Sequence, residues 1–139
     1  MKPCLNSIIE YTDLDHCEII VVANGCTDGT EEYLKSLPQS FRHVVVNEPI
    51  GYTAATNIGI RMATGDLVVL LNNDTVLLPQ KRNHWIETMI EPFKGNKEIG
   101  MTGPVKFIFK CGNTAREAMA FWCVMVKRKL FTELGLLDE

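Results

Sequence analysis

The sequence predicts an α/β fold in which helices cover both faces of a mainly parallel sheet. Three short apolar runs rich in β-branched residues, at 18–23, 43–47 and 67–71, alternate with segments of helical periodicity. Strands of this kind are buried on both faces, and each helical crossover has to return over the sheet, which favours parallel pairing. The length of 139 residues, with 46% hydrophobic and 22% charged residues, suits a single domain with one core.

The first half of the chain predicts alternating helices and strands. Apolar residues at near-helical spacing predict an opening helix that ends near 13–15. After the strand at 18–23, Thr27 or Thr30 is expected to cap a second helix, which Pro38 stops. The strand at 43–47 then leads into a third helix, which ends before the strand at 67–71 and completes a β-α-β-α-β pattern.

The second half predicts one long helix followed by further strands. An apolar and aromatic stripe predicts a helix that ends at Gly95 and packs on the core; its members are Trp85, Ile86, Met89, Ile90 and Phe93. The segments 99–109 and 121–126 are strand candidates, and 127–134 is expected to form a short amphipathic helix capped by Gly135.

Composition excludes several classes of protein. A net charge of −3 and the absence of a long basic run argue against nucleic-acid binding. The most apolar stretches fall short of the ~20 residues that a membrane-spanning helix needs. No secretory signal is visible, so a cytoplasmic protein is expected. The five cysteines contain no C-x-x-C pair, which predicts free thiols rather than disulfides or a zinc site.

Polar residues follow each predicted strand, at the edge where open α/β sheets bind their ligands. The loop at 23–30, A-N-G-C-T-D-G-T, places short polar side chains and two glycines before a helix, a composition that suits nucleobases and phosphates. An ordinary strand-to-helix turn would use the same residues. This loop alone therefore leaves both interpretations open.

The loop after the third strand predicts a metal site. Asn72 and Asp74 flank one residue at the end of an apolar run and offer two hard oxygen ligands, which suit Mg²⁺ or Mn²⁺. A cation there would bridge two phosphates and neutralise the charge of a departing nucleoside diphosphate. The alternative is a plain loop or helix cap, in which Asn and Asp are common.

Taken together, these motifs resemble those of inverting family 2 glycosyltransferases, particularly the rhamnosyltransferase-like group. The segment 22–30 is similar to the family's V-D-N-G-S-T-D-G-T, and 47–66 is similar to its N-x-G…A-x-N-x-G-I…A-x-G-D. The segment 70–75, L-L-N-N-D-T, resembles the family's variant of the D-x-D motif. The segments 121–128 and 134–139 resemble an acceptor-side region that ends in G-G-F-D-E.

The resemblance implies a three-layer α/β/α GT-A (Rossmann-like) fold and the transfer of a sugar, with inversion, to a glycan or other hydroxyl acceptor. The donor would be a UDP-, dTDP- or GDP-linked sugar. Asn72 and Asp74 would hold the metal and diphosphate, and the loop at Ala23 and Asn24 would receive the nucleobase and ribose. Further substrate-binding positions implied by the resemblance are Asp28, Gly51, Asn57, Asp66 and Asn73.

Three departures from the family pattern qualify this expectation. Ala23 stands where the family often has an acidic residue near the nucleobase. The family's first strand is missing before the opening helix, so another segment or a second copy of the chain, forming a homodimer, is expected to fill or bypass its place. The family's catalytic base lies in an E-D motif beyond the last residues, which leaves Asp138 and Glu139 as the only weak candidates for this role.

Two further hypotheses follow from these departures. The chain could be a nucleotide-sugar-binding module without catalysis, or a structural fragment that only associates with other surfaces. The transferase hypothesis requires that neighbouring strand ends bring Asn24 and the Asn72/Asp74 pair around a common diphosphate-sized hollow.

Overall fold

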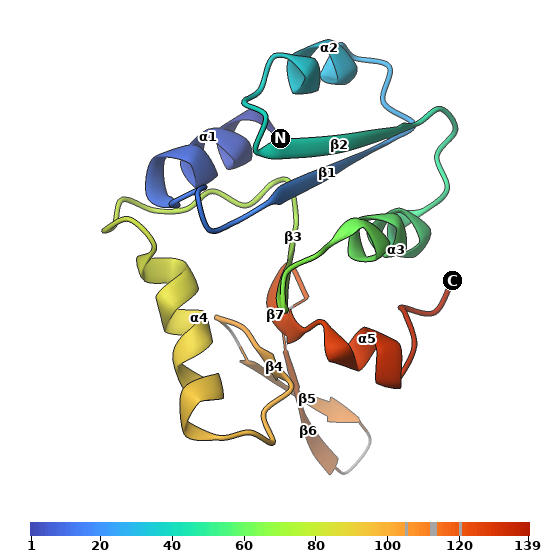
Figure 1. Cartoon of the computed structure of the whole chain (residues 1–139). Helices are drawn as coiled ribbons and strands as arrows, with labels where there is room; N and C mark the ends of the chain where they lie inside the picture. The colour runs from blue at the N-terminus through green and yellow to red at the C-terminus, as the bar shows by residue number, and fades with distance from the viewer. Residues whose placement is uncertain (105, 112–113, 120) are drawn as a thin grey trace. The chain divides into compact units, whose positions relative to one another are not determined.

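The computed structural model describes residues 1–104, 106–111, 114–119 and 121–139 (Figure 1). It divides into two compact units. Unit 1 comprises Met1–Asp13 and Leu67–Leu130, and unit 2 comprises Leu14–Asp66 and Phe131–Glu139. Each unit is described by itself, and the expected single domain stays a prediction.

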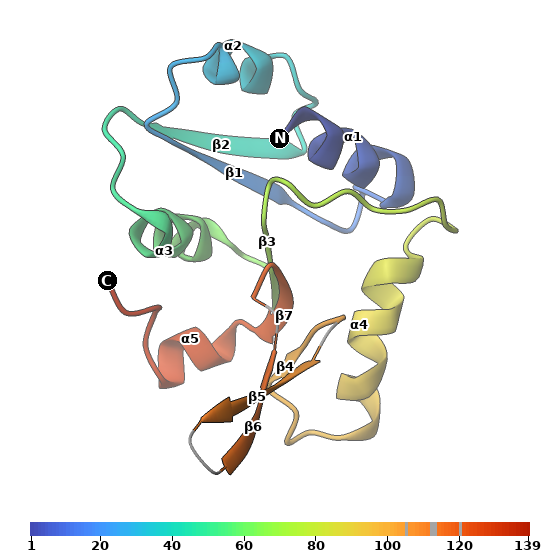
Figure 2. The ribbon, with the colours of Figure 1, turned by 180° about the vertical axis from the view of Figure 1, so that it is seen from behind.

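Unit 2 is a two-stranded parallel sheet with a helix on each side. Its elements are β1 (Ile19–Asn24), α2 (Thr30–Lys35), β2 (Phe41–Val46) and α3 (Tyr52–Met62). In the parallel register, Ile19 lies opposite Phe41 and Asn24 lies opposite Val46. Figures 1 and 2 show α2 and α3 on opposite sides of this pair. The predicted order of strands and helices is confirmed here, with bounds that differ by one to two residues.

The start of α2 differs from the prediction. Its N-cap is Gly29, at φ 77°, and no side chain caps the helix. The predicted caps Thr27 and Thr30 are therefore wrong. The Thr30 hydroxyl donates instead to the Asp28 carboxylate, at 2.6 Å. Glycine suits this left-handed backbone conformation, because glycine has no Cβ to clash with the backbone.

Unit 1 combines helices with antiparallel strands. Its elements are α1 (Lys2–Tyr11), β3 (Leu67–Leu71), α4 (His84–Gly95), β4 (Met101–Thr102), β5 (Lys106–Cys111), β6 (Thr114–Met119) and β7 (Cys123–Lys127). The strand order is β3-β7-β4, and β5 and β6 form a separate antiparallel hairpin. The unit boundary falls within α5 (Lys129–Glu133). Parallel pairing within the described residues is thus confined to β1 and β2.

The core of unit 1 lies between α4 and the sheet. Met89 of α4 packs with Cys123 and Met125 of β7, and all three are buried. The aromatic and aliphatic stripe predicted for α4 packs against this cluster, which confirms its core role. The predicted strand at 99–109 is in fact divided into β4 and β5, and β6 was not predicted, since T-A-R-E-A-M is poor in strand-forming residues.

Both units have strands with a single neighbour among the described residues. Within the part of the chain that the structure describes, β1 pairs only with β2, and β3 pairs only with β7. Apolar strands with an open edge tend to recruit another strand. The expectation that another segment or a second copy covers these edges stays a prediction. None of the described helices is long and apolar enough to cross a membrane.

Candidate functional site

In unit 2 the loops after β1 and β2 are tied together by the Asn24 side chain. Its Oδ1 accepts the Ile50 N–H at 2.9 Å, and its Nδ2 donates to the Gly51 carbonyl at 3.1 Å. The next residue, Gly25, donates its N–H to the Val46 carbonyl at 2.8 Å. The two loops therefore form one continuous surface at the carboxyl ends of the two parallel strands.

Glycine is required at the centre of this surface. Gly25 has φ +68°, and a Cβ there would lie 2.8 Å from both Cδ and N of Pro49. Gly51 is the N-cap of α3, with φ 86° and open space where a Cβ would be. Gly25 therefore lets the first loop pack closely against Pro49, whereas Gly51 leaves the backbone at the start of α3 exposed to a ligand.

The other substrate-binding residues predicted in unit 2 lie in different environments. Ala23 is 2% exposed, so its methyl group belongs to the core. Asp28 lies next to the start of α2 and accepts the Thr30 hydroxyl. Asn57 is 1% exposed and hydrogen bonds to the end of the chain, at Leu137 and Glu139. Each of these roles in substrate binding stays a prediction.

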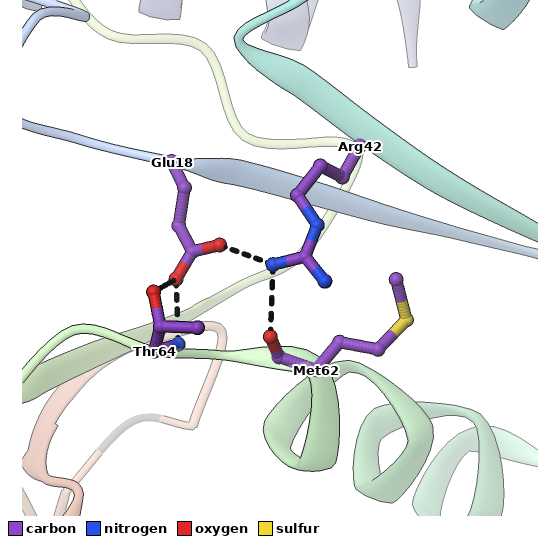
Figure 3. Close-up of polar contacts among 4 residues, drawn as sticks. All are labelled: Glu18, Arg42, Met62 and Thr64. Atoms are coloured by element: carbon purple, nitrogen blue, oxygen red, sulfur yellow. Dashed lines mark hydrogen bonds and ion pairs between the residues drawn. The ribbon is translucent and has the colours of Figure 1, made fainter.

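A polar cluster that the sequence did not predict lies at the opposite end of the strands (Figure 3). One carboxylate oxygen of Glu18 accepts the Thr64 N–H at 2.6 Å and the Thr64 hydroxyl at 2.7 Å. The other accepts Arg42 Nη1 at 2.6 Å, and the same nitrogen donates to the Met62 carbonyl at 2.9 Å. The cluster fastens the end of α3 to β1 and β2. Glu18 directly precedes β1 and Arg42 is the second residue of β2, so the cluster lies at the amino ends of these strands and is a structural anchor.

The Glu18 carboxyl has an altered pKa. Burial alone would raise its pKa, but the hydrogen bonds from Thr64 and Arg42, with the Arg42 charge, lower the pKa below the ordinary value of 4.5. Glu18 is therefore ionised at neutral pH and holds its three donors as a carboxylate. No periodicity or motif signals such a cluster, because its residues are distant in sequence.

In unit 1 the segment after β3 turns sharply and leaves its side chains open. The Asn72 N–H donates to the Trp122 carbonyl at 2.9 Å, and the Thr75 N–H donates to the Asn72 carbonyl at 3.1 Å. The side chains of Asn73 and Asp74 are exposed and have no partner among the described residues. The backbone is fixed while the carboxylate of Asp74 remains available to a ligand.

The chemistry near this turn suits a hard cation. Across the described residues, no group of three or more His, Cys, Asp or Glu side chains could hold a metal by itself. Asp74 and Asn72 would thus supply two oxygens and leave other positions to phosphates and water, as is usual for Mg²⁺. Burial, then the neighbouring Cys4, raises the pKa of Cys123 to about 11, so this thiol is protonated at neutral pH.

Trp122 is a neighbour of the turn; it belongs to the segment 121–128, which resembles an acceptor-side region, but it was not named as a site residue. Its carbonyl accepts the Asn72 N–H directly after the last pair of the β3–β7 register, Leu71 with Cys123. Trp122 is 37% exposed and Phe121 is 44% exposed, which is unusual for adjacent aromatic residues. The signal in the sequence is the pair of adjacent aromatic residues, Phe121 and Trp122, directly before β7. This pair could have indicated that Trp122 lies beside the turn.

The predicted residues therefore gather in two sets. Unit 2 holds Ala23, Asn24, Asp28, Gly51 and Asn57, and unit 1 holds Asn72, Asn73 and Asp74. Asp66, at the last position of its segment of unit 2, is exposed and has no partner among the residues described. The common hollow expected for Asn24 and the Asn72/Asp74 pair stays a prediction.

Comparison with known proteins extends these observations. Residues 1–137 match the family described as Glycosyl transferase family 2. The glycosyltransferase AglE of Haloferax volcanii is 27% identical over 121 residues, which cover 84% of this chain and 38% of that protein. An uncharacterized glycosyltransferase of Methanocaldococcus jannaschii is also 27% identical over 121 residues, with 84% and 40% covered.

A solved structure shows the same fold. It is the mannosyltransferase PcManGT from Pyrobaculum calidifontis in complex with GDP-Man and Mn²⁺, with a TM-score of 0.75 and 21% sequence identity. The match covers 99% of this chain and 43% of that protein, so this chain spans less than half the length of these relatives. The predicted GT-A type of α/β fold is confirmed, and the chain belongs to glycosyltransferase family 2.

Proposed function

We propose that this chain provides the donor-binding part of a glycosyltransferase that moves a sugar from a nucleoside diphosphate to a hydroxyl acceptor with inversion. Family membership supports the class of reaction. The observation that carries the proposal is the exposed, unpartnered carboxylate of Asp74, on a turn whose backbone is fixed to Trp122 directly after β3.

The metal-binding role is assigned to Asp74, with Asn72 as the second ligand. Both are hard oxygen donors, and their number fits a cation that also binds phosphates. A divalent cation held there would neutralise charge on the departing nucleoside diphosphate. The PcManGT complex contains Mn²⁺, which makes Mn²⁺ the first cation to test here, with Mg²⁺ as the alternative.

The nucleotide-binding role is assigned to the joined loops of unit 2. Asn24 holds their shape, Gly25 allows their close packing, and Gly51 leaves the backbone accessible. The first turn of α3 follows Gly51 and contains no acidic residue, so its free N–H groups and helix dipole favour an anion such as a phosphate. GDP-mannose, the ligand in the PcManGT complex, is the first donor to test, followed by UDP- and dTDP-sugars.

The acceptor role is assigned to the last residues of the chain. An inverting transfer requires a carboxylate that takes the proton of the acceptor hydroxyl while the anomeric carbon is attacked from the opposite face. The family resemblance places this base in an E-D motif beyond Glu139, so Asp138 and Glu139 are only weak candidates for the role.

Titration of the wild-type chain with GDP-mannose, UDP-glucose and dTDP-rhamnose, each with and without Mn²⁺, tests the proposal. We expect one donor to bind with an affinity that falls by about 10-fold or more when EDTA removes the cation. Absence of binding by every donor would contradict the proposed function and would favour a structural fragment.

A second candidate function is nucleotide-sugar binding without transfer. It is favoured by Glu139, whose carboxylate accepts a hydrogen bond from Asn57 and lies 3.9 Å from Arg61, so it is not free to act as a base. Parallel measurement of donor binding and donor hydrolysis separates the two. Binding with no hydrolysis above the uncatalysed rate would support the second function.

A further inference from the structure

The segment 72–83 connects β3 to α4 and contains the proposed metal ligands Asn72 and Asp74. All of its residues are described, and none belongs to a helix or strand, so no regular hydrogen-bond ladder fixes its shape. Its shape therefore depends on contacts with other parts of unit 1. Figures 1 and 2 show the segment passing alongside α1, which belongs to the same unit.

Helix α1 contacts the segment on both sides of Asp74. The Cys4 thiol donates a weak hydrogen bond to the Asn72 carbonyl, at 3.8 Å. The Ser7 hydroxyl accepts the Leu77 N–H at 3.0 Å. Cys4 and Ser7 are three residues apart in α1, so they share one face of the helix, and both are buried. Asp74 therefore lies between two points that are held on one face of one helix.

Ser7 uses its hydroxyl both as a donor and as an acceptor. The O–H donates to the Cys4 carbonyl at 2.8 Å, which leaves the oxygen to accept the Leu77 N–H. A side chain without an oxygen at this position would leave that backbone N–H without its acceptor, which is unfavourable away from water. Because the thiol contact at Asn72 is weak, the Ser7 hydroxyl is the stronger of the two contacts.

The far end of the segment is held by residues that follow α1. Asn83 Oδ1 accepts the Asp13 N–H at 2.6 Å, and the Asn83 N–H donates to the Tyr11 carbonyl at 2.8 Å. Trp85 Nε1 donates to the hydroxyl of Thr12, which is 0% exposed. These contacts hold the junction with α4 rather than the turn after β3. The Thr12 hydroxyl is thus a buried acceptor of the same kind as Ser7, in a different place.

We infer that Ser7 is a positioning residue, whose hydrogen bond from the Leu77 N–H holds the turn at 72–77 in the shape in which Asp74 binds the cation of a nucleoside diphosphate. This inference rests on the proposed function. Ser7 acts through the backbone of the turn and does not contact the ligand. The inference gives α1 a role in donor binding that no motif within the helix indicates.

Three variants test this inference. Ser7→Ala removes the acceptor of the Leu77 N–H. Ser7→Cys keeps a similar size but offers only a weak sulfur acceptor, and it takes the place of Ser7→Ala if that variant does not fold. Thr12→Val is the matched control, because it removes a buried hydroxyl acceptor at the other end of the segment with little change in shape.

The first measurement is hydrogen–deuterium exchange of the Leu77 amide in the absence of nucleotide. We expect Ser7→Ala to lower its protection by about 10-fold or more, because the N–H loses its acceptor. Thr12→Val should leave this protection unchanged. Wild-type protection of Leu77 in both Ser7 variants would overturn the contact on which the inference depends.

The second measurement is calorimetric titration of GDP with Mn²⁺, and of GDP with EDTA. We expect Ser7→Ala to weaken Mn²⁺-dependent binding by about 5-fold or more, since a loosened turn no longer presents Asp74 in a fixed position. The affinity for GDP in EDTA should stay at the wild-type value. Thr12→Val should bind like wild type under both conditions, even where it lowers the stability of the fold.

A merely structural role of Ser7 predicts a different result. In that case both Ser7 variants would lose stability, as Thr12→Val does, but a folded variant would keep wild-type Mn²⁺-dependent affinity. That result would overturn the inference. An equal loss of affinity with Mn²⁺ and with EDTA would also overturn it, because the effect would then not pass through the cation.

The two proposals fail in different ways. Failure of the wild-type chain to bind GDP with Mn²⁺ overturns the proposed function, and the positioning role of Ser7 with it. Wild-type binding that the Ser7 variants fully retain overturns the positioning role alone. The exchange experiment needs no nucleotide, so the hydrogen bond between Ser7 and Leu77 is established or overturned in either case.

Discussion

The loops of unit 2 and the turn after β3 in unit 1 use the same residue types for opposite purposes. In unit 2, Asn24 and Asn57 direct their amides at backbone groups and act as parts of the scaffold. In unit 1, Asn73 and Asp74 have no partner among the described residues, while the backbone around them is fixed. The comparison teaches that the partners of a polar side chain, rather than its type, distinguish a scaffold residue from a candidate ligand.

The largest effect on stability is expected at Gly25. Gly25→Ala combines a left-handed φ with a Cβ 2.8 Å from Pro49, so we expect a loss of about 2 kcal/mol or more in the free energy of unfolding. Urea denaturation measures it. Gly59→Ala is the control in the same unit, because its Cβ would be 3.5 Å from Val22 and alanine favours a helix. Equal stability of the two variants would contradict the account of the unit 2 loops.

A smaller effect is expected at Asn24. Asn24→Asp replaces the donor to the Gly51 carbonyl with an oxygen, so we expect about 1 kcal/mol of destabilisation. Asn73→Asp makes the same chemical change at a side chain without a partner, and its stability should stay within about 0.5 kcal/mol of wild type. Thermal unfolding compares the pair. Equal losses of stability in Asn24→Asp and Asn73→Asp would contradict the distinction between side chains that hydrogen bond to the backbone and side chains without a partner.

An effect of similar size is expected at Glu18, and it depends on pH. Because its folded pKa lies below the ordinary 4.5, the carboxylate stabilises the fold above that pH, and the contribution is lost as pH falls through the lowered pKa. Glu18→Gln should lose about 1 kcal/mol at neutral pH. We expect the difference from wild type to shrink when urea denaturation is repeated below pH 4.5. A difference that does not change with pH would contradict the role of the ionised carboxyl.

Much of the fold could be predicted from the sequence because it follows from local patterns. Apolar runs and helical periodicity located β1, β2, β3, α3 and α4. The pairing of β3 with β7 depends on residues far along the chain, so no local pattern contains it. The N-cap of α2 was missed because the left-handed Gly29 takes the cap position and Thr30 is already the first residue of the helix.

The candidate site was predictable in its residue types but not in their partners. The polar loops and the family resemblance indicated Asn24, Asn57, Asn72 and Asp74 as one group of substrate- and metal-binding residues. It could not indicate that Asn57 is buried against Leu137, because that contact joins residues 80 positions apart. Trp122 was missed for the same reason, since its position beside Asn72 follows from strand register.

The central claim is that Asp74, whose side chain has no partner among the described residues, is a ligand of the metal. Calorimetric titration of GDP with Mn²⁺ into wild type and Asp74→Asn is its most direct test. The substitution removes a charge that has no partner among the described residues, so folding should be unaffected. We predict that Mn²⁺-dependent binding falls by about 100-fold or more, and that Asn72→Ala weakens it less. Wild-type affinity in a folded Asp74→Asn variant would contradict the account.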